Sequence, residues 1–144
     1  MTKEEIFAII NGMEHPVMYV ATVENGNPHV RGILLYKTDE NGIVFHTGKS
    51  KELYHQLTAN PNAEVCFVSG KYQIRVEGQF QLLNDINYKR EIVAHPSRKF
   101  LQGWIKEMGE EQFFDFLQVF KMEHGKAHVW TFEDNFAPKS FVTL

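Results

Sequence analysis

Alternating apolar and polar residues predict a series of short strands along this chain. The clearest alternation runs over 72–83, where apolar side chains share one face and glutamine, arginine and glutamate side chains share the other. Gly78 interrupts the apolar face, which predicts a bulge or a position that another group approaches closely. Asn25-Gly26 and the turn that ends at Gly42 supply hairpin turns. The predicted strands span 17–23, 29–38, 63–69, 72–83 and 126–133, and one more begins at Gly42.

Apolar residues at helical spacing predict helices at the N-terminus and after the third strand. The first helix spans 2–13 and opens with a capping box formed by Thr2 and Glu5. The second is expected to have Ser50 as its N-cap, because this serine directly precedes a run with helical periodicity.

The helices predicted late in the chain are strongly apolar. One runs from Asp85 to Ala94, the next follows the break at His95, and the last begins at Glu110. The apolar stripe of this last helix consists of Phe113, Phe116, Leu117 and Phe120. Because such a face is unstable in water, we expect these helices to cover a barrel end or a partner subunit.

Six short, mostly hairpin-linked strands with helices inserted between them predict an α+β protein that is mainly β. The expected architecture is a six-stranded antiparallel barrel with flanking helices, formed by a single domain over 1–144. No glycine-rich dinucleotide loop follows any strand. A cleft shared between two subunits would give so short a chain room for a binding site.

Composition narrows the classes of function. A formal net charge of −3 argues against a nucleic-acid partner, since such proteins present a basic face. Cys66 is the single cysteine, which excludes a disulfide framework, and its apolar neighbours predict a buried thiol. No signal peptide or membrane-spanning apolar run is present, so we expect a cytoplasmic protein without a membrane partner. His124 and His128 are not spaced to share a metal, and no metal site is predicted.

The stretch 42–53 has the features of an anion-binding site. A strand is expected to end near Thr47 and a helix to begin at Ser50, where unpaired N–H groups carry a partial positive charge. Lys49 and Lys51 lie beside this helix start. A phosphate would fit among these groups, while an ordinary capped helix with solvated lysines is an equally good interpretation of the same residues.

Arg31 is the second candidate for anion binding. It shares a strand face with Ile33 and Leu35, where an arginine needs an anion, although a solvated edge position or a structural salt bridge is the alternative. Pairing across the turn at 39–42 is expected to bring Arg31 beside Thr47. Two elements would then reach one phosphate.

Four segments follow one another between Val17 and Leu83: Arg31-Gly-Ile-Leu-Leu-Tyr36, Phe45-His-Thr-Gly-Lys-Ser-Lys-Glu-Leu53, Asn60-Pro-Asn-Ala-Glu-Val-Cys-Phe67 and Gln73-Ile-Arg-Val-Glu-Gly78. In order and approximate spacing they resemble the pyridoxamine 5'-phosphate oxidase-like family of FMN-binding split-barrel proteins. The resemblance implies a split barrel and a homodimer with two FMN sites at the subunit interface.

The resemblance also implies which residues contact FMN. The residues expected to hold its phosphate and ribityl chain are Arg31, Thr47, Ser50 and Lys51. The backbone of 33–36 would run along the isoalloxazine ring, and Gln73 matches a position from which the partner chain reaches the flavin. The full cofactor-binding set is Arg31, Gly32, Ile33, Leu34, Tyr36, His46, Thr47, Lys49, Ser50, Lys51 and Gln73. Core packing is the favoured role of Trp130 and Phe132, and flanking the ring is the alternative.

Two departures from the family pattern bear on the reaction. Oxidases of this family usually have a lysine where this chain has Tyr36, and an arginine and a histidine near the end, where 135–144 offers only Lys139. We therefore expect an FMN oxidoreductase that passes electrons from a reduced nicotinamide or similar donor to a small acceptor, rather than a true pyridoxamine phosphate oxidase. A non-catalytic barrel that binds flavin or haem as a sensor, carrier or store is the alternative. No side chain is assigned as catalytic.

Overall fold

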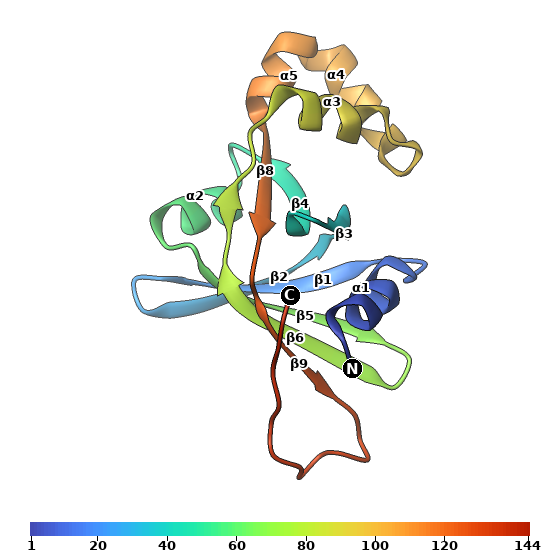
Figure 1. Cartoon of the computed structure of the whole chain (residues 1–144). Coiled ribbons are helices and arrows are strands. Elements are labelled where there is room, and N and C mark those ends of the chain that lie inside the picture. The colour runs from blue at the N-terminus through green and yellow to red at the C-terminus, as the bar shows by residue number, and fades with distance from the viewer.

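Two antiparallel sheets form the body of the molecule in the computed structural model, which describes residues 1–144 (Figure 1). The larger sheet has six strands in the order β10-β9-β6-β5-β1-β2, and the smaller has four in the order β3-β4-β8-β7. The strands are β1 Val17–Glu24, β2 Asn27–Leu34, β3 Lys37–Asp39, β4 Gly42–Gly48, β5 Asn62–Ser69, β6 Tyr72–Gln79, β7 Gln81–Leu82, β8 Leu117–Met122, β9 Lys126–Trp130 and β10 Val142–Thr143. A six-stranded antiparallel sheet with flanking helices confirms the predicted α+β class.

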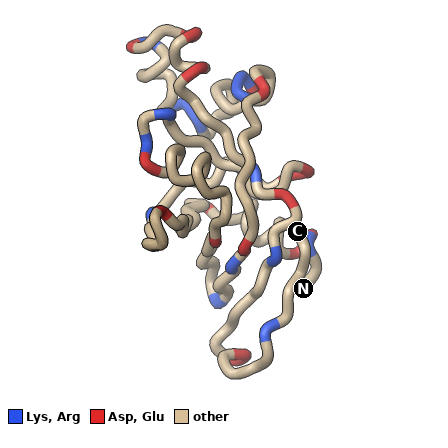
Figure 2. The backbone as a smooth tube through the Cα atoms, turned by 90° about the vertical axis from the view of Figure 1, so that its left-hand side faces the viewer, with Lys and Arg blue, Asp and Glu red and all other residues tan.

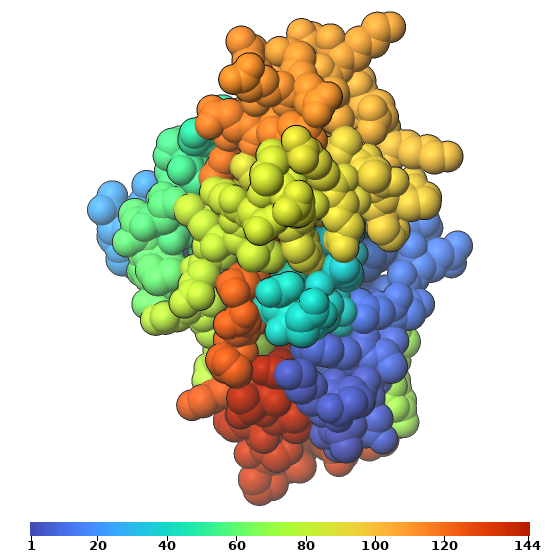
Figure 3. Space-filling model, turned by 45° about the horizontal axis from the view of Figure 1, so that its top comes forward, coloured from blue at the N-terminus to red at the C-terminus, as the bar shows by residue number.

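Helices cover the barrel from several sides. They are α1 Lys3–Asn11, α2 Glu52–Ala59, α3 Ile86–Ala94, the 3₁₀ helix η1 Pro96–Leu101, α4 Gln102–Met108 and α5 Glu110–Phe116. The predicted capping box opens α1, because the Glu5 N–H donates to Thr2 Oγ1 (3.2 Å) and the Thr2 N–H donates to Glu5 Oε2 (2.7 Å). Residues 86–116 form a helical cap over one end of the barrel, which Figure 3 shows in yellow to orange as one continuous mass.

Both predicted hairpin turns are present. Asn25 and Gly26 have φ values of 52° and 78°, as a primed two-residue turn requires. Gly42 has φ 82°, and a Cβ at this position would overlap the carbonyl oxygen of Met122. The β3–β4 hairpin can therefore lie directly against the end of β8 only with glycine here.

Two of the predicted strands are split between the sheets. The segment 29–38 forms β2 and β3, separated at Leu35-Tyr36, and the segment 72–83 forms β6 and β7, separated at Phe80. Leu35 and Phe80 are buried at these corners. Because apolar and polar residues keep alternating through a corner, the sequence pattern does not reveal it.

Strand β2 is an edge strand of the larger sheet. It pairs with β1 along its whole length, with Arg31 opposite Val20. Of the two halves of the predicted strand 29–38, β3 pairs with β4 and β2 does not. The predicted strand pairing that placed Arg31 beside the Thr47 end of β4 is therefore wrong. The backbone N–H and C=O groups on one side of β2 therefore have no partner strand.

The predicted helix from Glu110 is wrong beyond Phe116. The following residues, Leu117–Met122, form β8 and pair with β4. Side chains of β8 alternate between two cores, with Val119 under the helical cap and Phe120 in the barrel. Burial on both faces produces a continuous apolar run, in which periodicity does not separate strand from helix.

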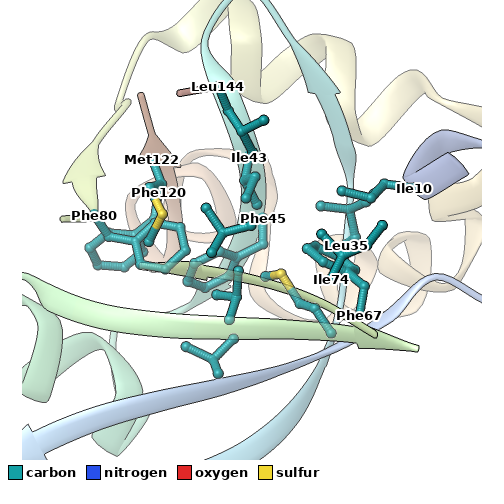
Figure 4. Close-up of a cluster of buried hydrophobic side chains, with 14 of the residues drawn as sticks. Ile10, Leu35, Ile43, Phe45, Phe67, Ile74, Phe80, Phe120, Met122 and Leu144 are labelled. Atoms are coloured by element: carbon teal, nitrogen blue, oxygen red, sulfur yellow. The ribbon is translucent and has the colours of Figure 1, made fainter. Parts of the chain in front are cut away.

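Aromatic side chains fill the centre of the barrel. The ring of Phe45 lies edge-on to that of Phe80, with centroids 4.9 Å apart, and stacks on that of Phe120 at 5.5 Å (Figure 4). Ile6 and Ile10 of α1 belong to the same buried cluster. This core fixes the position of β4, from which the candidate site is built.

Three smaller features complete the fold. The tail, which has no sequence pattern, returns to the sheet as β10, and the Leu144 N–H donates to the Gly125 oxygen (2.8 Å). Gly78 is closely approached by Met122, as predicted. Cys66 is half-buried rather than buried, because it lies on the outer face of the sheet opposite Tyr19. None of the helices has the length and apolar character needed to cross a membrane.

Candidate functional site

A cleft of about 480 Å³ lies between the edge strand β2, the end of β4 and the helical cap. This volume is in the range of small-molecule sites in proteins. Of the residues predicted to bind a cofactor, the cleft brings together Gly32, Ile33, Leu34, His46, Thr47 and Lys51. The others, Arg31, Tyr36, Lys49, Ser50 and Gln73, do not line it.

The cleft also has an apolar wall that sequence reasoning missed. Its members are Phe100, Leu101, Trp104, Met108, Phe113, Phe116 and Leu117. All of them except Leu117 belong to the helical cap. Phe100 and Trp104 are half-exposed in the structure, and large apolar side chains left in water indicate a binding surface; the sequence shows their helical spacing but not this exposure.

The edge of β2 offers free backbone groups to the cleft. The Leu35 N–H donates to the Pro16 oxygen (2.8 Å), and hydrogen-bonded pairs alternate along an antiparallel ladder. The N–H and C=O groups of Gly32 and Leu34 therefore point away from β1. A flat ligand lying along this edge can form hydrogen bonds with these groups without any side chain.

The start of α2 supplies the positive end of the cleft. The helix begins at Glu52 with Lys51 at the N-cap position, so the predicted N-cap at Ser50 is wrong. A tight turn causes the difference, because the Lys51 N–H donates to the Gly48 oxygen (3.0 Å) before the helix begins. No side chain caps α2, and Lys51 has no ion-pair partner. Lys49 instead pairs with Asp115 at 3.3 Å.

Arg31 lies beside α2 but inside a polar network. Its guanidinium donates to Thr22 Oγ1 (2.8 Å) and to Oε1 of the buried Gln56, which belongs to α2. Burial lowers the pKa of Arg31, and the nearby Glu52 carboxylate opposes this shift. Arg31 forms no ion pair, so its charge is not neutralised directly. Arg31 therefore contacts α2 about one turn beyond the helix start at which Lys51 lies.

Arg98 is a second residue that sequence reasoning missed. It is 2% exposed, donates from Nε to His46 Nε2 (2.8 Å), and donates from its terminal nitrogen to the Leu35 oxygen (2.7 Å). It thus fills the gap where β2 and β4 diverge. Burial, together with the charge of Arg98, lowers the pKa of His46 to about 4. Nothing in the local sequence distinguishes Arg98 from the neighbouring Lys99.

Tyr36 points away from the cleft and into the helical cap. Its hydroxyl donates to Glu91 Oε2 (2.8 Å), and the Arg98 guanidinium carbon lies 5.3 Å from the centre of its ring. Burial and the bond to Glu91 raise the pKa of Tyr36. Tyr36 contacts the strands beside the site through its backbone alone, because its N–H donates to the Val44 oxygen of β4.

Gln73 lies on the outer face of the six-stranded sheet. The pairing register places five residues in one row across this face: Leu34, Val17, Val68, Gln73 and Trp130. Because Leu34 also lines the cleft, the row leads directly to the site. Within one chain, Gln73 does not reach the cleft.

The two aromatic candidates on the last strand lie apart from the core. Trp130 is half-buried and its indole N–H donates to Asn135 Oδ1 (3.0 Å). Phe132 is strongly exposed, so its predicted role in core packing is wrong. Charged residues of both signs are scattered over the whole molecule, without an extended basic face (Figure 2).

Comparison with known proteins gives a consistent result. The chain matches the family model described as pyridoxamine 5'-phosphate oxidase over residues 2–130. It is 28% identical over 116 residues to pyridoxine/pyridoxamine 5'-phosphate oxidase of Escherichia fergusonii, a match that covers 72% of this chain and 53% of that protein. The chain therefore spans about half the length of this curated relative.

Solved structures share the fold at low sequence identity. A NimC/NimA family protein from Clostridium acetobutylicum has a TM-score of 0.74 and 19% identity, over 98% of this chain and 92% of that one. An FAD-binding protein from Mesorhizobium loti has a TM-score of 0.61 and 14% identity, over 91% and 96%. A haem-binding protein from Mycobacterium smegmatis has a TM-score of 0.64 and 12% identity, over 94% and 55%.

The family match includes every element that forms the cleft, from β2 through the helical cap to β8. At such low identities the solved structures support the architecture alone. The chain belongs to the pyridoxamine 5'-phosphate oxidase family and has its FMN-binding split-barrel fold.

Proposed function

We propose that this chain is an FMN-binding oxidoreductase whose cleft seats one flavin per chain. The observation that carries the proposal is that a free strand edge and an uncapped helix start meet in one cleft of suitable volume. When bound, FMN supplies the redox chemistry, taking a hydride from a reduced nicotinamide or similar donor and passing electrons to a small acceptor.

The residues at the start of α2 fit the phosphate. Lys51 forms no ion pair, and the first N–H groups of α2 have no intrahelical acceptor. Thr47 lines the same cleft. Arg31 contacts α2 through Gln56, about one turn beyond the helix start, and we expect its positive charge to act on a bound dianion from outside the cleft.

The strand edge and the apolar wall fit the ring system. The free backbone groups of Gly32 and Leu34 would form hydrogen bonds with the polar edge of the ring. Phe100 and Trp104 would cover an apolar face and exclude water from it. The chain's contribution to the reaction is then orientation, exclusion of water and fixed hydrogen-bond donors.

A second copy of the chain would complete the site. The row from Leu34 to Trp130 leaves Val17 and Val68 exposed, and Tyr19 lies in the next row with about half of its surface in water. A homodimer formed through this face would bury these side chains and bring the partner's Gln73 toward the cleft.

Adding charge to this face tests the homodimer. We expect the wild type to have twice the 16.8 kDa mass of the chain in light scattering, and the double variant Tyr19→Glu, Val68→Glu to be monomeric and to bind FMN weakly. Buried like charges across an interface disfavour association strongly. Leu82→Glu, a similar change at an exposed leucine on the other sheet, is the control. A monomeric wild type would exclude the shared site.

Turnover separates the enzyme from a non-catalytic barrel. The haem-binding protein with this fold makes a carrier or sensor the second candidate. We expect the purified protein with FMN to lose its yellow absorbance under anaerobic addition of NADH or NADPH. Persistence of the colour with both donors would favour a flavin carrier, and a Soret band in place of a flavin spectrum would favour haem.

A further inference from the structure

Arg98 is a buried cation without an acidic partner. Its hydrogen bonds go to His46 Nε2, the Leu35 oxygen and Ser97, and it forms no ion pair. Burying a charge without an anion is costly, and such groups are found where a fixed charge or a fixed geometry is needed. Of the two side chains that hydrogen-bond to Arg98, those of His46 and Ser97, only His46 lines the cleft.

The contact with Arg98 determines the protonation of His46. An arginine Nε always carries its proton, so His46 Nε2 must accept with its lone pair, and the imidazole proton must lie on Nδ1. The charge that acts on His46 comes from Arg98 on η1, while β8 presents Val119 opposite it in the ladder. With a pKa lowered to about 4, His46 is neutral at physiological pH. Its Nδ1–H has no protein acceptor.

His46 lies on the ring side of the cleft rather than the phosphate side. Side chains alternate along β4, and Val44 packs with the helical cap whereas Phe45 packs in the barrel. His46 therefore faces the cap, where its ring centre lies 6.4 Å from that of Phe100. Thr47 has the orientation of Phe45.

We propose that His46 is a neutral hydrogen-bond donor to an acceptor atom of the heteroaromatic ring of the bound ligand, and that Arg98 is the positioning residue that fixes its tautomer. The proposal rests on the flavin site proposed above. It differs from the expectation that His46 assists the phosphate anion. The bond would contribute to ring recognition without adding a positive charge.

FMN and riboflavin differ only in the phosphate, so comparing their affinities shows whether His46 binds the ring or the phosphate. We expect His46→Ala to raise the Kd of FMN and of riboflavin by the same factor, about 2- to 13-fold, which corresponds to about 0.5–1.5 kcal/mol for a neutral hydrogen bond. Lys51→Ala should raise the Kd of FMN alone. His124→Asn is the control, because His124 is exposed and follows the end of β8 opposite to Leu117, which lines the cleft. A loss confined to FMN would place His46 at the phosphate and overturn the proposal.

Nitrogen NMR of the flavin-free protein tests the role of Arg98 independently. We expect the His46 signals, assigned by their loss in His46→Ala, to report an Nδ1–H imidazole that stays neutral down to about pH 5. Arg98→Met should mix the tautomers and raise the His46 pKa, and Arg98→Lys should restore part of the wild-type behaviour. A wild-type His46 with its proton on Nε2, or with an ordinary titration, would refute the positioning role even if Arg98→Met does not fold.

These two experiments separate the inference from the proposed function. If the wild type binds neither flavin, the flavin site and the ligand contact of His46 both fail, and the NMR result alone decides the Arg98 contact. If FMN binds and His46→Ala changes neither Kd, the flavin site stands and the role of His46 is refuted.

Discussion

Replacing Lys51 by alanine should raise the Kd of FMN by about 13-fold or more. Charge-assisted hydrogen bonds to a phosphate contribute about 1.5–3 kcal/mol, and the exposure of Lys51 favours the lower end of that range. Fluorescence titration measures the effect. Arg90→Ala removes a positive charge from α3, outside the cleft, and should leave the Kd unchanged. An unchanged Kd in Lys51→Ala would show that the phosphate does not bind at the start of α2.

Arg31→Ala should also weaken FMN binding, but by less than Lys51→Ala, because Arg31 lies outside the cleft and its charge acts on the phosphate from a greater distance. Because this arginine also donates to Thr22 and Gln56, thermal unfolding must be measured beside the titration. Arg31→Lys keeps the charge but loses the planar fork, so it should bind with intermediate affinity. A lowered Tm with an unchanged Kd in the folded protein would show that Arg31 stabilises the fold and does not contribute to FMN binding.

Replacing Phe45 by alanine should lower the free energy of unfolding by about 3–5 kcal/mol, as for other fully buried phenylalanines. Its ring contacts those of Phe80 and Phe120, and the cavity left behind would lie under β4. Urea denaturation followed by circular dichroism measures this loss. Phe136, which is 97% exposed, offers the matched control, and its change to alanine should cost less than about 0.5 kcal/mol. A loss below about 1 kcal/mol for Phe45→Ala would contradict the described core.

Local signals predicted the parts of the fold that are determined locally. The capping box at Thr2, the Asn25-Gly26 hairpin and the Asp85 N-cap each depend on residues within four positions of one another, and all are present. The corners at Leu35 and Phe80 depend on which sheet each half of a strand joins. That choice is made by packing between distant segments, so alternation alone does not reveal it.

The same distinction applies to the candidate site. Thr47 and Lys51 lie in one short stretch, where a strand end and a helix start can be recognised together. Arg98 reaches His46 from 52 positions further along the chain, and the apolar wall is assembled from three elements of the helical cap, η1, α4 and α5, together with the start of β8. These contacts arise only when the cap closes over the barrel.

Calorimetric titration of the flavin-free protein with FMN and with riboflavin tests the central claim most directly. A phosphate seated at Lys51 and a ring seated along Gly32 and Leu34 predict saturable binding of one FMN per chain, with riboflavin binding at least about tenfold more weakly. Equal affinity for the two ligands, or no saturable binding of FMN, would contradict the assignment of this cleft as a flavin site.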